Sequence, residues 1–136
     1  MMIRMGLVAF MILLIGCTHQ NPVGEEDITR LKGGVVKVTA QANGMIKVGT
    51  GFIVQIEEDA AYIVTASHVI EGDPHPKVVF RAQGSKSFPA QVKGLKGGDP
   101  RGVAVLVVQG DVPRSLTALP VNSEFESNGG EEVTVI

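Results

Sequence analysis

Hydrophobic residues follow two patterns along this 136-residue chain. Gly6 to Ile15 form one short, unbroken apolar run, whereas from Gly34 onward short β-branched runs alternate with turn residues and show no long helical period. The predicted strands are Val35–Thr39, Lys47–Ile56, Ala61–Thr65, Lys77–Arg81, Phe88–Leu95 and Val103–Val108. Six strands at this spacing predict an all-β fold, a closed or nearly closed antiparallel barrel, because closure removes exposed strand edges.

The N-terminal apolar run begins after a single charge, Arg4, and is too short to span a bilayer comfortably, which indicates an export signal. Leu14-Ile15-Gly16-Cys17 resembles the lipobox of bacterial lipoproteins, in which the cysteine is lipidated and the preceding peptide is removed. The resemblance implies a signal peptide over residues 1–16, a lipid on Cys17, and a membrane-anchored protein of the cell envelope, outside the cytoplasm. A plain N-terminal anchor with a chance cysteine is the alternative.

The segment from His19 to Lys32 is polar and contains Asn21-Pro22 and the acidic run Glu25-Glu26-Asp27. This composition predicts a tether that holds the folded part away from the membrane. The expected organisation is therefore a lipid anchor and linker over residues 17–33 and one folded domain over residues 34–136.

Composition removes several classes of function. A net charge of −2 gives no basic field for nucleic acid, and a single cysteine excludes an internal disulfide. His75 has no cysteine or second histidine at ligand spacing, and no glycine-rich string continues into Lys-Ser/Thr, so we expect neither a metal nor a cofactor.

The chemistry of the chain centres on His68, which directly follows a predicted buried strand. Such a position fixes an imidazole on rigid backbone, as a general base requires. Thr65-Ala66-Ser67-His68-Val69 resembles the Thr-Ala-x-His motif of trypsin-like serine proteases, especially the bacterial HtrA/Deg branch, and Gly49-Thr50-Gly51-Phe52 resembles a strand motif of the same family. The resemblance implies the first barrel of a trypsin-like two-barrel fold, a protein or peptide substrate, and His68 as the general base.

The segment Gly98 to Leu106 resembles the one that holds the aspartate of the catalytic triad. In the family this aspartate directly precedes the strand, but here Gly102 stands in that place and the nearest carboxylate is Asp99. The aspartate orients the histidine and stabilises the imidazolium, so the departure bears on activity. Asp99 either reaches back to His68 or, as Asp-Pro favours, shapes a turn.

The sequence contains no Gly-x-Ser-Gly, the motif that carries the nucleophile and its oxyanion donors. Ser127-Asn128-Gly129-Gly130 does not match it, while Leu119–Ser123 and then Gly130–Ile136 resemble the interdomain link and first strand of the second barrel. We therefore expect a truncated serine endopeptidase that is inactive as this chain alone. The alternative is a non-catalytic binding or scaffold lipoprotein with the protease fold.

Overall fold

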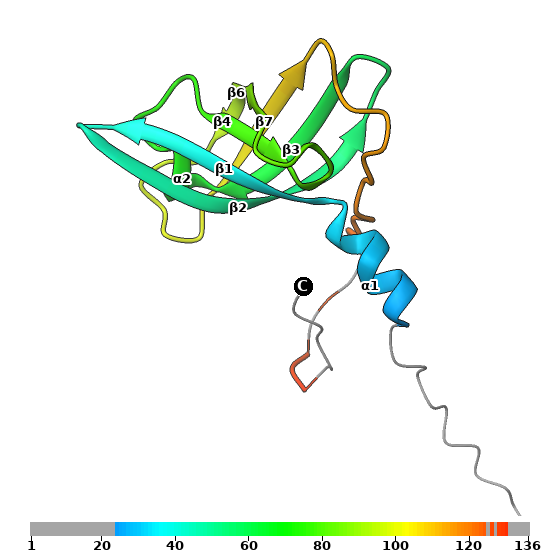
Figure 1. Cartoon of the computed structure of the whole chain (residues 1–136). Helices are drawn as coiled ribbons and strands as arrows, with labels where there is room; N and C mark the ends of the chain where they lie inside the picture. The colour runs from blue at the N-terminus through cyan, green and yellow to red at the C-terminus, as the bar shows by residue number, and fades with distance from the viewer. Residues whose placement is uncertain (1–23, 125, 127, 131–136) are drawn as a thin grey trace, which may run out of the picture.

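The computed structural model describes residues 24–124, 126 and 128–130. A strongly curled antiparallel sheet makes up most of this part, and helix α1 (Glu25–Lys32) lies outside the sheet just before its first strand (Figure 1). The strands are β1 (Val35–Ala42), β2 (Met45–Ile56), β3 (Ala60–Ala66), β4 (Lys77–Phe80), β5 (Ser87–Pro89), β6 (Gln91–Leu95) and β7 (Val103–Gln109). A short helix α2 (Ser67–Ile70) follows β3, and a 3₁₀ turn η1 (Arg81–Gln83) follows β4. The expectation of an all-β fold is confirmed.

The seven strands form one sheet in the order β5-β4-β1-β2-β3-β7-β6, and every neighbouring pair is antiparallel. The first and last strands of this order, β5 and β6, are separated in the chain by Ala90 alone. The sheet therefore curls until its two edges meet at Ala90. The Ala90 amide donates a 2.9 Å hydrogen bond to the Pro76 carbonyl, which anchors this corner.

The number of strands differs from the predicted six because the run Phe88–Leu95 is divided between β5 and β6. Pro89 has no amide hydrogen, so it cannot donate to a strand ladder, and it ends β5. The chain then bends at Ala90 and continues as β6 on the other edge. The predicted run is thus two strands joined by a bend, one at each edge of the sheet.

The core lies inside the curl and is built from alternate strand residues. Val36, Val38 and Ala40 of β1 are buried while the residues between them are not, as the two-residue period of a strand requires. The other fully buried large side chains include Phe80, Ile53, Ile63, Leu106 and Val78. Phe80 packs edge-to-face on Phe88 with ring centroids 5.1 Å apart. This core, which includes Ile63 of β3, supports the strand that leads to His68.

The predicted linker contains regular structure that the sequence analysis missed, since Glu25–Lys32 forms α1. Its acidic first turn and basic last turn suit the helix dipole. None of its residues is buried, and Ile28 and Leu31 are only half-buried. The polar run predicts a tether because so few apolar residues mark the helix.

Several predictions fall outside the described residues: the signal peptide 1–16, Cys17, Ser127 and, of the strand predicted over Gly130–Ile136, residues 131–136. They remain predictions. In the part of the chain that the structure describes, no helix is long and apolar enough to cross a membrane.

Candidate active site

His68 sits on α2, a single helical turn at the end of β3. The turn is closed by a 3.0 Å hydrogen bond from the Glu71 amide to the Ser67 carbonyl. Ser67, Val69 and Ile70 are buried, so His68 is the one side chain of this helix that is exposed. The structure thus presents the imidazole to solvent on backbone that its three neighbours hold in the fold.

Two glycines of β2 allow close packing, Gly49 against helix α2 and Gly51 against core side chains of the neighbouring strands. A Cβ on Gly49 would come within 2.5 Å of Val69 Cγ2, and one on Gly51 within 2.8 Å of Ile63 Cγ2. Between them, the Thr50 carbonyl accepts a 2.7 Å hydrogen bond from the Thr65 hydroxyl. Gly49 therefore makes room for Val69, the neighbour of His68, and Thr50 holds the end of β3 that leads to it.

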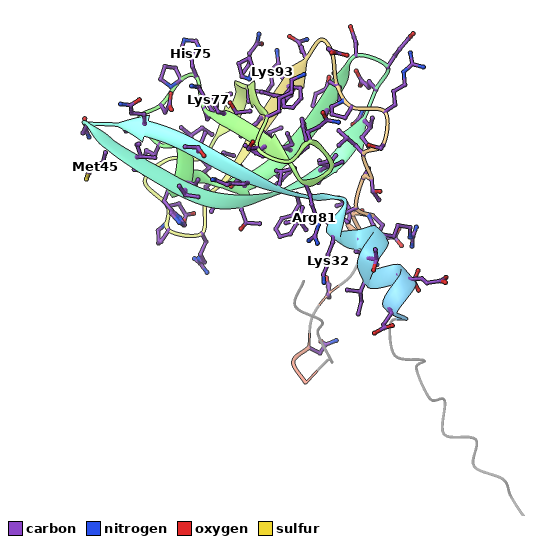
Figure 2. The ribbon with its side chains drawn as sticks, in the orientation of Figure 1. Lys32, Met45, His75, Lys77, Arg81 and Lys93 are labelled. Carbon is purple, nitrogen blue, oxygen red and sulfur yellow. The ribbon has the colours of Figure 1, made fainter. Side chains whose placement is uncertain are left out.

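The loop after α2 is tied to β1 by a carboxylate. Asp73 Oδ2 accepts from the Gln41 amide at 2.6 Å, and Asp73 Oδ1 accepts from the His75 amide at 2.8 Å. His75 itself projects from this loop (Figure 2) and is exposed. Asp73 did not stand out in the sequence, because an Asp-Pro pair in a loop is ordinary turn chemistry.

Gly102 lies beside the turn that carries His68, since its carbonyl accepts a 2.9 Å hydrogen bond from the Ser67 amide. A Cβ at this position would overlap the Lys96 carbonyl oxygen and lie 2.5 Å from Ser67 Oγ and 2.9 Å from the Asp99 carbonyl oxygen. The position at which the family resemblance places an aspartate therefore has no room for any side chain without a shift of backbone.

The Asp99 carboxylate is occupied within its own turn. Asp99 Oδ1 accepts a 2.9 Å hydrogen bond from the Arg101 amide, and Oδ2 lies 3.4 Å from Lys96 Nζ. The Asp99 carbonyl also accepts from the Gly102 amide at 2.8 Å. Among the described residues, none of these contacts joins Asp99 to His68. This is the geometry of a turn residue, and a catalytic role for Asp99 remains a prediction.

A shifted pKa occurs at the far end of β3, away from His68. The negative charge of Glu57 raises the pKa of Tyr62, whose hydroxyl donates to Glu57 Oε2 at 3.4 Å. Within residues 24–124, 126 and 128–130, no three His, Cys, Asp or Glu residues are grouped so as to hold a metal ion. The described residues of the site thus present an exposed imidazole beside a closed backbone turn.

Comparison with models of protein families and with curated proteins finds no match. Among solved structures, the chain resembles a serine endoprotease from Yersinia pestis, with a TM-score of 0.55 and 22% sequence identity over 72% of this chain. This chain therefore has a trypsin-like barrel fold. The likeness covers 32% of the length of the Yersinia protein, so this chain corresponds to about a third of it.

Proposed function

We propose that this chain supplies the base-bearing barrel of a serine endopeptidase, with His68 as the general base in the hydrolysis of peptide bonds in a protein or peptide substrate. The observation that carries the proposal is the exposed imidazole of His68 on α2, held between buried neighbours at the end of a barrel strand. A base must be within hydrogen-bond reach of the proton it removes, and this placement leaves His68 open to a nucleophile from outside the barrel.

We also propose that this chain alone does not cleave peptide bonds. The sequence contains no Gly-x-Ser-Gly, and imidazole by itself is a poor catalyst toward amides because it needs a positioned nucleophile and charge stabilisation. We further propose that Cys17 carries a lipid that holds the protein at the membrane of the cell envelope.

A non-catalytic role in binding or scaffolding is the second candidate, and one observation favours it. The closed packing around Gly102 leaves no room for the carboxylate that orients the histidine in this family. In proteases with the triad, replacing that carboxylate by an amide lowers kcat by about four orders of magnitude. A barrel that kept its fold without this group would be free to serve as a binding module.

The test joins residues 1–123 of this chain to the second barrel of a trypsin-like protease that contains Gly-x-Ser-Gly, and measures hydrolysis of casein. We expect no turnover by the unfused chain, and turnover by the fusion that His68→Ala abolishes. His75→Ala is the matched control, because His75 is also exposed but lies on the loop beyond α2. A fusion that folds and yet shows no activity dependent on His68 would support the binding module.

A further inference from the structure

The turn that carries His68 is too short to be stable by itself. α2 has only four residues, and a hydrogen bond from the Glu71 amide to the Ser67 carbonyl closes it. An isolated helical turn is unfavourable because it fixes many dihedral angles for a single bond, and its last carbonyls have no partner within the helix. Contacts from other elements must therefore hold His68 in place.

Lys47 of β2 provides such a contact from a distant part of the chain. Its Nζ donates to the His68 carbonyl at 3.2 Å and to the Glu71 carbonyl at 3.0 Å. A cationic donor near the end of a helix satisfies carbonyls that would otherwise lack partners. Both hydrogen bonds end on main-chain atoms, one of them on His68 itself.

Glu71 and Ser67 tie the opposite side of the turn to the loop that contains Gly102. Glu71 Oε1 accepts from the Gly98 amide at 3.3 Å, and the Ser67 amide donates to the Gly102 carbonyl at 2.9 Å. The turn thus lies between β2 on one side and the 96–102 loop on the other. Lys47 makes the hydrogen bonds on the β2 side, two residues before Gly49, on which Val69 is seated.

We propose that Lys47 is a positioning residue: its ammonium fixes the main chain of the turn and so fixes the direction of the His68 imidazole. In this site, where Gly102 leaves no room for a carboxylate, the histidine is positioned through its backbone. The inference rests on the proposed role of His68. Its test does not measure turnover, however. The positioning role of Lys47 can therefore fail while the proposed hydrolysis stands, and the proposed hydrolysis can fail while the positioning role stands.

The experiment compares Lys47→Met, Lys47→Arg and wild type in the full chain by NMR. The Glu71 amide donates to the Ser67 carbonyl and the Asp73 amide to the Ile70 carbonyl, so both report on the turn. In Lys47→Met we expect hydrogen exchange of these two amides to become about tenfold faster, since a hydrogen bond to a charged group is lost locally. Exchange of the Ile53 amide on β2, which donates to the carbonyl of Gly34 just before β1, should not change. Lys47→Arg keeps a cationic donor and should retain the protection.

The imidazole signals separate positioning from general stabilisation. The ring signal of His68 should broaden or move in Lys47→Met, while that of His75 stays as in wild type. Lys37→Met is the matched control, because Lys37 is an exposed lysine on the adjacent strand β1, and it should change neither ring. Unchanged exchange at Glu71 in Lys47→Met, an equal loss of protection at Ile53, or loss of protection in Lys47→Arg would each overturn the proposal.

If Lys47→Met does not fold, a measurement on the wild-type chain still tests the proposal. A lysine ammonium engaged with two carbonyls exchanges its protons with water more slowly than a free one, so at low temperature Lys47 should give a resolved ammonium signal. Loss of that signal in Lys47→Arg assigns it. If no such signal exists in wild type, Lys47 does not hold the turn.

Discussion

Gly102 illustrates how much one missing side chain determines around it. Its carbonyl accepts from the Ser67 amide, and its Cα faces the Lys96 carbonyl and Ser67 Oγ so closely that a methyl group overlaps both. An aspartate here would have to push the 96–102 loop away from α2. The glycine is therefore part of the packing of this loop and not simply an aspartate that has been lost.

We expect Gly102→Ala to lower the free energy of unfolding by about 1–3 kcal/mol, the cost of forcing extra atoms into a packed site. Urea denaturation followed by circular dichroism measures the change. Gly94→Ala on β6 is the matched control, because a Cβ at Gly94 meets no atom within 4 Å. If the two variants are equally stable, the packing described around Gly102 is wrong.

Tyr62 offers a direct test of local electrostatics, because it is the only tyrosine in the sequence. The charge of Glu57 raises the pKa of Tyr62 by repelling the phenolate. Replacing Glu57 with Gln removes that charge, so the pKa of Tyr62 should fall toward the ordinary value of about 10. Ultraviolet absorbance of the phenolate during a pH titration reports it without interference from other tyrosines.

The direction of the pKa shift of Tyr62 also predicts how the stability of the fold changes with pH. Since the pKa of Tyr62 is higher in the folded chain, the unfolded chain releases this proton first as the pH rises. The contribution to stability is complete below the unfolded pKa and is lost as the pH rises through the folded one. Glu58→Gln is the control, because the charges that raise the pKa of Tyr62, beside its burial, are those of Glu57 and Asp59. A larger fall of the pKa in Glu58→Gln than in Glu57→Gln would contradict the assignment.

Strands were the elements that the sequence predicted best, and the reason is physical. β1 carries buried residues at alternate positions, which a two-residue hydrophobic period reveals directly. β7 instead buries Leu106, Val107 and Val108 in succession, and its short apolar run is what marks it as a strand. The end of β5 was missed because the predicted run Phe88–Leu95 is apolar on both sides of Pro89. α1 was missed because a helix with no buried residue leaves little hydrophobic period to detect.

The sequence marks one residue of the candidate site, His68, whereas the contacts that hold it join residues distant in the chain. The motif around His68 identified the exposed imidazole, because strand, small residue and histidine are consecutive. Lys47 is 21 residues from His68, and nothing in its own surroundings marks it. The crowding at Gly102 arises from a carbonyl at Lys96, whose position depends on how the loop folds.

The corner at Ala90 yields a prediction for the two edge strands. Ala90→Pro removes the amide that donates to the Pro76 carbonyl and should destabilise the chain by about 1–3 kcal/mol, the cost of leaving a buried acceptor without its partner. Thermal unfolding measures the loss. Ala90→Gly keeps the amide and should cost less. Equal losses in the two variants would show that the hydrogen bond contributes little.

Membrane attachment of the intact protein is predicted through Cys17. Several acyl chains, at about 0.8 kcal/mol for each buried CH₂ group, hold a protein on a bilayer stably. Cells that express wild type should therefore show lipid label on the protein in the membrane fraction, and Cys17→Ser should carry no label. Cys17→Ala is a second variant that removes the thiol. Absence of label on wild type would refute the lipoprotein proposal.

The single residue between β5 and β6 also sets the order in which the chain can assemble. β1 and β2 form one hairpin and β2 and β3 the next, so their contacts are local. β4 pairs with β1 and β7 pairs with β3, each across a longer stretch of chain. Local pairings form fastest because they close the shortest loops. Residues 87–95 can dock on both sides only after β4 and β7 are in place. Until then two strand edges stand open to other chains, and aggregation during refolding should compete with this last step.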